Sequence, residues 1–517
     1  MNPEEKRQYS ERAFTNFLHT PLDTRLQQHC NVEPATAALE LFYNVAATVP
    51  AYKAFLTQNG INPAKIQTFA DFQTLPPLTK ENYLQQHPLT DLCRYGKIES
   101  CDMIAASSGS TGKPTYWCRF FSDELEITTR FEQIFHDSFC ADTKSTLAVI
   151  CFALGTWVGG MFTTNCCRYL ASKGYLVTVI TPGNNKDDIL RVVSELGGAF
   201  DQVVLLGYPP FLKDVIDSGI ARGIEWGQYS IKLVTAGEVF SEEWRNLVAE
   251  RVGYASGTLA RSQNPCYDFA SLYGTADAGV LGNETPLSIC IRRFLAENPE
   301  VARALFGESR LPTLVQYDPI NRFFEVKDGV LLFSGNNGIP LIRYNILDNG
   351  GIITYDAMLE FLAEWGFNPV DALFAQDRQD AYPTRRGIRN LPFVYVFGRS
   401  NFTVSYFGAN IYPENVTVGL EQPIIKEWVT GKFVLQVIED TDKNRFLTVT
   451  VELAPNVEIS EDKKQEITTS ILSQLKRLNS EFANYVPQQY QMPQVTLKLH
   501  GDVEYFPVGV KHRYTRK

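Results

Sequence analysis

The sequence predicts an α/β fold, in which a large N-terminal domain over residues 1–400 precedes a small C-terminal α+β domain over residues 401–517. Two observations lead to this prediction. Between residues 145 and 252, short apolar segments alternate with amphipathic ones, which is typical of a parallel sheet covered by helices. Beyond residue 330 the pattern changes to short strands and turns, which indicates a β-rich subdomain within the large domain.

The first half of the chain is assigned from the spacing of its apolar residues. The first hundred residues are expected to be helix-rich, because apolar residues recur there at helical spacing. The segment from Ser145 to Cys167 is uncharged over the length of a membrane span. Three glycines (Gly155, Gly159 and Gly160) interrupt it, so a strand, a loop and a helix are preferred. The expected strands are 147–154, 175–180, 203–207 and 231–235, and the expected helices are 161–170, 187–196, 210–218 and 241–252.

The second half of the chain is assigned in the same way. Segments 329–333 and 338–343 are expected to pair as antiparallel strands. Residues 355–390 mix helical spacing with proline and arginine, so they are expected to form an insertion. The C-terminal domain is expected to contain a strand at 446–452, a helix at 461–478 and a strand at 494–498.

Composition restricts the class of protein. The chain has 44% hydrophobic and 21% charged residues, as in ordinary globular proteins, and a formal net charge of −10. Acidic and basic residues are interspersed, so neither nucleic acid nor a membrane is expected as a partner. Ten cysteines without Cys-x-x-Cys spacing indicate reduced thiols in a cytoplasmic protein. The six histidines show no metal-ligand spacing, so no structural zinc site is expected.

A glycine- and hydroxyl-rich segment is the most informative local feature. Within Ser107–Lys113 there are four hydroxyls, two glycines and one lysine, which together suit a polyphosphate. Only two residues separate Gly109 from Gly112, and Pro114 follows the lysine, so this is not the P-loop of common NTPases. Taken alone, the segment is equally consistent with a surface linker.

Further motifs follow the glycine loop in a fixed order. They are Thr235-Ala-Gly-Glu238, Tyr273-Gly-Thr-Ala-Asp277, Leu341-Ile-Arg-Tyr344 with Asp348, Gly398-Arg399, Gly408-Ala-Asn-Ile-Tyr-Pro413 and Lys511. In this order they resemble the adenylate-forming superfamily of acyl-CoA synthetases, adenylation domains and luciferases. The segment Leu75-Pro-Pro-Leu-Thr-Lys80 is similar to the phenylacetate-CoA ligase-like branch. The resemblance covers the chain from about Thr74 to its C-terminus.

The resemblance implies a ligase that activates a carboxylic acid with ATP and passes the acyl group to coenzyme A. The transition state places charge on phosphate oxygens, so cations and hydrogen-bond donors must surround it. Asp277 would hold Mg²⁺, and Lys113, Lys511 and Asp277 would be catalytic. Asn401 would be the hinge to a mobile C-terminal domain, and Gly408–Pro413 would line the pantetheine tunnel. The implied nucleotide-binding residues are Ser107, Ser108, Gly109, Ser110, Thr111, Gly112, Gly237, Glu238, Tyr273, Gly274, Thr275, Asp348 and Arg399.

Several positions depart from the family pattern. Ala276 and Asp277 replace a hydroxyl residue and Glu, Asn345-Ile-Leu347 replaces Arg-Thr-Gly, and Val510 separates Gly509 from Lys511, which leaves Lys517 as the reserve lysine. These departures keep two other functions open. One is transfer of the acyl group to an amine or a carrier-protein thiol, and the other is a nucleotide-binding protein that has lost catalysis.

Individual residues also have structural alternatives. Glu238 is equally suited to be the first acidic residue of the helix at 241–252. Asp277 could cap a turn, and Asp348 and Arg399 could form an exposed ion pair. Trp157, Phe162 and Leu272 suit either the walls of an acyl pocket or the core. The sequence leaves the identity of the acid and a homodimer open.

Overall fold

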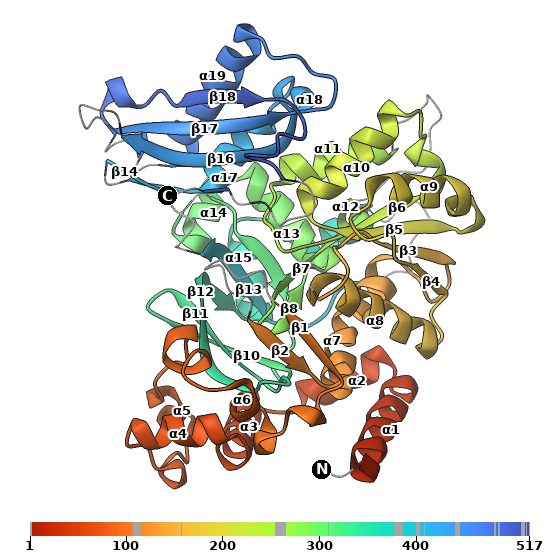
Figure 1. The fold of residues 1–517 in the computed structure, drawn as a ribbon, viewed down its shortest axis with the longest axis vertical. Helices are drawn as coiled ribbons and strands as arrows, with labels where there is room; N and C mark the ends of the chain where they lie inside the picture. The colour runs from red at the N-terminus through yellow and green to blue at the C-terminus, as the bar shows by residue number, and fades with distance from the viewer. Residues whose placement is uncertain are drawn as a thin grey trace.

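A mixed eleven-stranded sheet organises the part of the chain that the computed structural model describes. The order across the sheet is β10-β11-β12-β13-β9-β8-β7-β6-β5-β3-β4. Neighbouring strands are parallel from β4 through β3, β5 and β6 to β7, and they are antiparallel from β7 to β10 at the opposite edge. The predicted parallel sheet and the β-rich subdomain are therefore halves of one sheet (Figure 1). The described residues are 3–106, 115–156, 158–253, 265–308, 310–376, 386–399, 404–407, 409–439, 445–479, 482–483, 486–507, 512 and 514–515.

The parallel half buries both faces of its strands. Successive residues of β3 alternate between two cores, with Leu147 and Val149 on one face and Ala148 and Ile150 on the other. One face packs against α7 and α8, and the other packs against α9, α10 and α11. The elements are β3 (Thr146–Ile150), β4 (Val177–Ile180), β5 (Gln202–Gly207), β6 (Ile231–Ala236), β7 (Phe269–Thr275), α7 (Phe121–Gln133), α8 (Val158–Lys173), α9 (Lys186–Leu196), α10 (Pro209–Ala221) and α11 (Glu242–Gly253).

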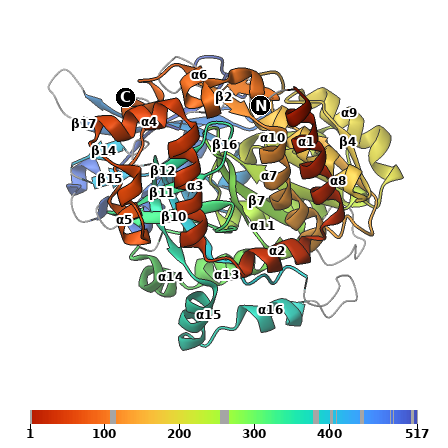
Figure 2. The same ribbon diagram turned by 90° about the horizontal axis from the view of Figure 1, so that it is seen from below.

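The antiparallel half rests on the N-terminal helices. Helices α3, α4 and α5 contribute Phe42, Tyr52 and Phe72 to the core that they share with these strands. Figure 2 shows α3 beside β10 and β11 in the view from below. The strands of this half are β8 (Gly279–Asn283), β9 (Thr313–Gln316), β10 (Arg322–Lys327), β11 (Val330–Gly335), β12 (Leu341–Ile353) and β13 (Phe393–Arg399). The N-terminal helices are α1 (Pro3–His19), α2 (Leu22–Cys30), α3 (Pro34–Thr48), α4 (Pro50–Gln58), α5 (Phe69–Thr74) and α6 (Leu89–Leu92), and three more helices follow later in the chain, α12 (Pro265–Asp268), α13 (Pro286–Glu297) and α14 (Pro299–Phe306).

The expected insertion contains two helices, α15 (Tyr355–Glu364) and α16 (Pro369–Gln376). Its return to the sheet is fixed by two arginines. Arg386 makes a bidentate ion pair with Asp142, and Arg389 makes one with Asp137. The arginine-rich character of this segment therefore has a structural explanation, because both guanidinium groups attach it to the end of the α7 region.

The C-terminal residues form a separate sheet with its own core. Helix α19 packs Ile467, Ile471 and Leu475 against this sheet, which lies above the large one in Figure 1. The helix and last strand match the predicted ranges, whereas the boundary at residue 400 stays a prediction. The elements are β14 (Val404–Tyr406), β15 (Ala409–Ile411), β16 (Val429–Glu439), β17 (Arg445–Leu453), β18 (Gln494–Lys498), α17 (Pro413–Leu420), α18 (Ile425–Trp428) and α19 (Glu461–Leu478).

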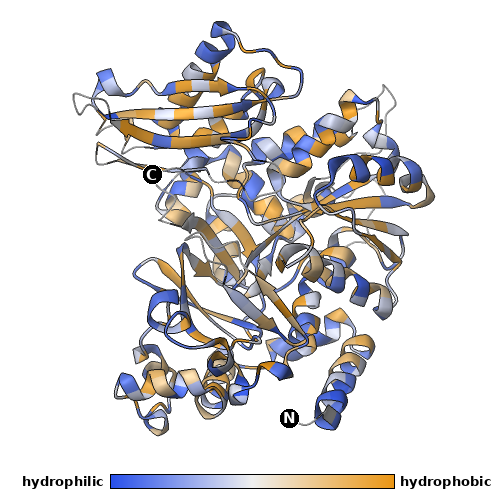
Figure 3. Cartoon of the chain, in the orientation of Figure 1, coloured by the Kyte–Doolittle hydropathy of each residue, from blue (hydrophilic) through white to orange (hydrophobic). Residues whose placement is uncertain are grey.

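A two-stranded hairpin, β1 (Met103–Ala106) and β2 (Tyr116–Arg119), flanks the predicted phosphate loop. The loop residues 107–114 lie outside the described residues. Hydropathy follows burial, because the strands of the large sheet are mostly apolar while outer helices alternate polar and apolar residues (Figure 3). Within the described ranges, we find no helix with both the length and the apolarity to cross a bilayer.

Candidate functional site

The turn between β7 and β8 contains the Tyr273–Asp277 motif. Strand β7 continues to Thr275, and the turn is closed by the Ala278 N–H, which donates to the Thr275 hydroxyl (3.1 Å). A Cβ on Gly274 would come within 2.6 Å of the Gly279 carbonyl oxygen. Glycine is therefore required here for close approach of β8. Because Thr275 caps the turn, Asp277 is left for another role.

Tyr273 of β7 and Asp348 of β12 meet although three strands of the sheet separate β7 from β12. The Tyr273 hydroxyl donates to Asp348 Oδ2 at 2.7 Å, and the tyrosine ring lies against Phe324 with centroids 6.4 Å apart. Asp348 is 5% exposed, so the alternative of an exposed ion pair is wrong. Arg399 lies opposite Asp348 in the register of β12 and β13. The structure thus brings three predicted nucleotide-binding positions together.

An irregularity in β12 sets the position of Asp348. The pairing with β11 skips from Asn345 to Asn349, so the intervening residues bulge out of the ladder. The Leu347 N–H donates to the Asn345 side chain (2.8 Å), and Leu347 has a positive φ of 65°. The segment that replaces the family's Arg-Thr-Gly therefore keeps a left-handed residue at its third position, without glycine.

Asp277 is 3% exposed and lies between two other predicted motifs. Its Oδ2 accepts a hydrogen bond from the Tyr344 hydroxyl at 2.7 Å, and its Oδ1 is 4.0 Å from Lys80 Nζ. The side chain of Asn337 donates to the Asp277 carbonyl (3.4 Å), and its Oδ1 is buried without a hydrogen-bond partner among the described residues. A hydroxyl and an ammonium therefore lie against this buried carboxylate, and an amide contacts the main-chain carbonyl of the same residue.

The Leu75–Lys80 segment owes its position to β12. Leu78 forms an isolated bridge with Tyr344, with the Leu78 N–H donating to the Arg343 carbonyl at 3.1 Å. Arg343 is buried and ion-paired to Glu325 at 2.9 Å. We therefore interpret Arg343 as an anchor that holds this segment, and Lys80 as a site residue that the sequence motif contained but did not assign.

Arg119 connects the hairpin to the same turn. Its guanidinium donates to the carbonyl of Ala276, and the side chain is 1% exposed. Burial lowers the pKa of Arg119, and the carboxylates of Asp123 and Asp277 act in the opposite direction. A cation is therefore fixed beside Asp277 from the strand that follows the predicted phosphate loop.

The second part of the candidate site is the loop after β6. Gly237 has a positive φ of 82°, and Glu238 accepts a hydrogen bond from the Tyr514 hydroxyl at 2.6 Å. Burial and the Glu238 carboxylate raise the pKa of Tyr514 well above its usual range. Helix α11 begins at Glu242, so Glu238 is not its first acidic residue. The C-terminal segment therefore reaches the loop of Gly237 and Glu238, which the sequence predicts to bind the nucleotide.

The tail is placed by strand pairing. Thr515 bridges Leu435 of β16, and the Leu435 N–H donates to the Tyr514 carbonyl at 2.7 Å. Lys511 lies outside the described residues, as do Ser107, Ser108, Gly109, Ser110, Thr111, Gly112 and Lys113. Their predicted roles stay predictions. Tyr514 is a contact that the sequence analysis did not foresee.

A pocket lies between the loop after Glu238 and the C-terminal unit. Residues 239–243 line one side, and Glu414, Thr417 and Val418 of α17 line the other. Arg310 lies beside it, with its guanidinium carbon 3.8 Å from the centroid of the Tyr412 ring. The predicted pantetheine loop leads directly into α17, and α17 lines one side of this pocket.

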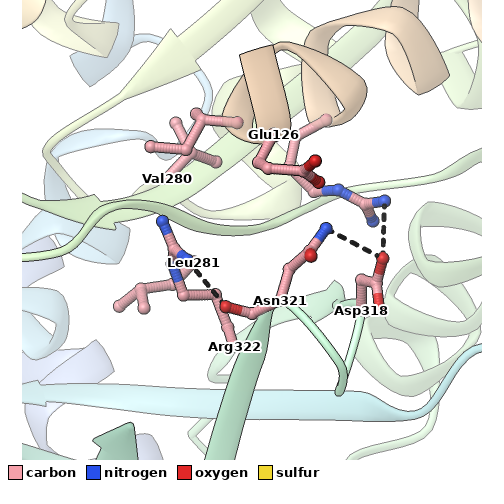
Figure 4. A pocket seen from close by; sticks show the side chains of 8 residues that line it. Glu126, Val280, Leu281, Asp318, Asn321 and Arg322 are labelled. Atoms are coloured by element: carbon pink, nitrogen blue, oxygen red, sulfur yellow. Dashed lines mark hydrogen bonds and ion pairs between the residues drawn. The ribbon is translucent and has the colours of Figure 1, made fainter. Parts of the chain in front are cut away.

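A second, smaller pocket lies away from these residues (Figure 4). Asp318 accepts a hydrogen bond from Asn321 at 3.1 Å and lies 3.8 Å from an Arg130 nitrogen. Its lining charges balance one another, and it contains none of the predicted site residues, so we interpret it as structural. Phe162 and Leu272 are buried in the core, and Trp157 lies outside the described residues.

Comparison with known proteins gives similarity at the level of the fold. No protein-family model and no curated protein matches the chain. The chain is similar to crystal structures of 2-hydroxyisobutyryl-CoA ligase. In the postadenylation state with 2-HIB-AMP the TM-score is 0.63, with 12% identity over 93% of this chain and 88% of that chain. In the thioesterification state with 2-HIB-AMP and CoA the TM-score is 0.51, with 12% identity over 97% and 91%.

These similarities confirm the predicted α/β fold, which the chain shares with these CoA ligase structures. The higher score for the postadenylation state indicates that the overall arrangement of this chain is more similar to that state. The phenylacetate-CoA ligase-like branch stays a prediction.

Proposed function

We propose that the chain is an ATP-dependent ligase that converts a carboxylic acid to an acyl-adenylate and transfers the acyl group to coenzyme A. The observation that supports this most is the pairing of Tyr273 with Asp348 and of Tyr344 with Asp277 at one edge of the sheet. In this proposal Asp348 would accept hydrogen bonds from the ribose hydroxyls and Asp277 would hold a cation, in a fold shared with a CoA ligase.

The proposed reaction has two steps. A carboxylate oxygen of the acid attacks the α-phosphorus of ATP, and pyrophosphate leaves. The thiolate of coenzyme A then attacks the acyl carbon, the thioester forms, and AMP leaves. Asp348 would accept hydrogen bonds from the ribose, while residues 107–112 and Lys113 would surround the leaving pyrophosphate. Lys511 would neutralise charge at the α-phosphate and the carboxylate.

Mg²⁺ is the metal that this proposal requires, and the residues present fit it. Magnesium prefers oxygen ligands and is commonly held by one or two carboxylates together with substrate phosphates. Asp277 offers a carboxylate, and Asn337 Oδ1 is an amide oxygen with no partner among the described residues. When bound, Mg²⁺ would offset the charge on the phosphate oxygens.

The C-terminal unit has the second role in this proposal. Residues 401–517 would be the mobile domain, with Asn401 as hinge, and the pocket beside Arg310 would admit the pantetheine arm. Support comes from Tyr514, which connects the tail to Glu238, and from the lining of that pocket by both parts of the chain. Rotation of this unit would exchange Lys511 for the thiol at the acyl carbon.

The test is acid-dependent release of pyrophosphate from Mg-ATP over a panel of aryl and aliphatic carboxylic acids. We expect release with at least one acid, and acyl-CoA by mass spectrometry when coenzyme A is added. Lys511→Ala should abolish release while retaining the thermal shift caused by ATP. Release that yields only acyl-AMP would favour an amine or carrier-thiol acceptor. Neither release nor a thermal shift with Mg-ATP would overturn the proposal.

A further inference from the structure

Three cysteines that are distant in the sequence meet beside the base of the β1–β2 hairpin. Cys93 follows α6, Cys101 precedes β1, and Cys118 lies on β2. Their sulfur atoms all lie within 4.8 Å of one another, and the sulfurs of Cys93 and Cys118 are 3.5 Å apart. Cys93 and Cys118 are buried and Cys101 is half-buried. The three thiols therefore form an enclosed cluster, which we call the thiol cluster.

The separations of the sulfurs distinguish between two uses of such a cluster. A disulfide holds its sulfurs at about 2.0 Å and would leave the third thiol unused. A tetrahedral zinc ion with Zn–S bonds of about 2.3 Å holds its sulfurs about 3.8 Å apart. The sulfurs of Cys93 and Cys118 are 3.5 Å apart and all three sulfurs lie within 4.8 Å of one another, which fits the spacing in a zinc site and not that in a disulfide. All ten cysteines of the chain are free thiols. The geometry therefore favours a metal ion, and thiolates favour Zn²⁺ over Mg²⁺.

Two further polar groups lie on the segment that precedes α6 and Cys93. Nε2 of His87 and the hydroxyl of Tyr83 are buried and have no hydrogen-bond partner among the described residues. Their rings are in edge contact, with centroids 5.6 Å apart. Tyr83 belongs to the same buried core as Cys93 and Cys118. Unpaired buried nitrogen is costly, and imidazole is a usual zinc ligand.

We propose that Cys93, Cys101 and Cys118 bind a structural Zn²⁺ ion, with His87 as the fourth ligand. The histidine is not within 4.8 Å of all three sulfurs, so its ring would move toward the ion on binding. The expectation that the chain lacks a zinc site relied on short spacing between ligands. These residues are separated by gaps too long for that pattern.

The position of the thiol cluster explains what the ion would do. It would tie the N-terminal helical region to both strands of the hairpin whose loop is the predicted phosphate loop. Arg119 follows Cys118 directly and donates to the Ala276 carbonyl. A Cβ on Gly338 would lie 2.1 Å from the Cys118 carbonyl oxygen, so the other side of β2 is closely packed. The ion would therefore fix the base of this hairpin beside Asp277.

The test measures the metal directly and does not depend on activity. Protein purified without chelators should contain about one zinc ion per chain by elemental analysis. Replacement by Co²⁺ should give thiolate-to-metal charge-transfer absorption and the intense visible bands of tetrahedral cobalt. Cys101→Ser removes one proposed ligand, so both signals should be lost. Because Cys101 is half-buried, its replacement leaves the core intact. Cys30→Ser, which changes an exposed cysteine, should keep them.

Two further measurements make the proposal falsifiable even where a variant folds poorly. A zinc chelator should lower the melting temperature of the native chain and leave that of Cys101→Ser unchanged. His87→Ala should weaken Co²⁺ binding and shift its visible bands. Absence of bound metal and of the cobalt–thiolate absorption in the native chain would overturn the proposal. A disulfide within the thiol cluster, found after blocking free thiols, would also overturn the proposal. An unchanged cobalt spectrum in His87→Ala would exclude His87 as the fourth ligand.

Discussion

The two parts of the candidate site are stabilised in different ways. In the sheet half, which we define as Tyr273–Asp277 with Tyr344 and Asp348, the side chains lie on strands of the large sheet or on the turn that joins β7 to β8. In the tail half, defined as residues 237–241 and Tyr514, contacts join separate elements through single side chains. The first is built into the large sheet, whereas the second depends on how the C-terminal unit lies against it.

Ionisable groups are distributed differently between these halves. Around the tail half, Ser241 donates to Glu421, and Lys213 donates to the Val429 carbonyl at 2.9 Å. Burial raises the pKa of Glu421 to about 8 and lowers that of Lys213 to about 7. We therefore expect substitutions in the sheet half to change the reaction rate or the nucleotide affinity. In the tail half, we expect stability also to depend on pH near neutrality.

The largest effect is expected from Asp277→Ala in the sheet half. Loss of the buried carboxylate removes the proposed cation ligand, so acyl-adenylate formation should fall by about 10²-fold or more. Pyrophosphate release at saturating ATP and acid measures this. Tyr344→Phe is the matched control, because it removes only the hydroxyl that donates to Asp277, and it should cost less than about tenfold. A native rate in Asp277→Ala would exclude the carboxylate from the chemistry.

Asp348→Ala should act on nucleotide affinity. A charged acceptor for two ribose hydroxyls is worth about 1.5–3 kcal/mol, so KM for ATP should rise roughly 10–100-fold while kcat changes little. Tyr273→Phe keeps the ring and removes one hydrogen bond to Asp348, so its effect on KM should be only a few-fold. Steady-state kinetics with varied ATP separates the two. An equal fall in kcat would place Asp348 in the transition state instead.

Tyr514→Phe should weaken the tail half without changing nucleotide affinity. The hydrogen bond to Glu238 contributes about 1 kcal/mol, so adenylation should slow by roughly 3–10-fold. A double-mutant cycle with Glu238→Gln tests the contact itself. If the bond positions the tail, the two effects are not additive. Additive losses would show that Tyr514 and Glu238 act separately.

The same comparison explains what could be predicted from sequence. The helix at 461–478 and the strand at 494–498 are found at their predicted bounds, because apolar periodicity is a local signal. Tyr273 and Asp348 were named from motifs, and the structure pairs them. Antiparallel strands were predicted past residue 330, but not their union with the parallel sheet.

Contacts between distant residues without a motif could not be predicted. Lys80 approaches Asp277, and Tyr514 contacts Glu238, only because β12 and β16 bring remote segments together. Nothing local marks Asn337 as a neighbour of Asp277. The thiol cluster is the extreme case, since its residues come from a helix end, a loop and a strand. Each of these contacts depends on tertiary structure that periodicity does not encode.

The smallest effect should be the pH dependence of the contact around Glu421. Its raised folded-state pKa means that the stabilisation is fully present below the unfolded value and is lost as pH rises through about 8. For Lys213 the folded-state pKa is lowered, so its contribution is lost as pH falls through about 7. The Glu421 contribution is lost between about pH 4.5 and 8, and the Lys213 contribution is gained between about pH 7 and 10.5, so the contact should be least stable at about pH 7–8.

Glu421→Gln should remove the fall in stability between about pH 4.5 and 8. Glutamine cannot ionise and keeps an oxygen that accepts from Ser241, so near pH 9 the variant should melt roughly 2–4 °C above the native chain. Lys213→Met should correspondingly remove the rise in stability above about pH 7. Glu243→Gln is the control, since Glu243 also faces Glu421 but begins the exposed side of α11. Melting curves across this pH range measure all three, and a fall in stability that survives in Glu421→Gln would assign it to another group. If this pH dependence of the melting temperature is lost in Glu421→Gln and kept in Glu243→Gln, the uncharged, buried Glu421 stabilises the tail half, and the sheet half has no such group in this comparison.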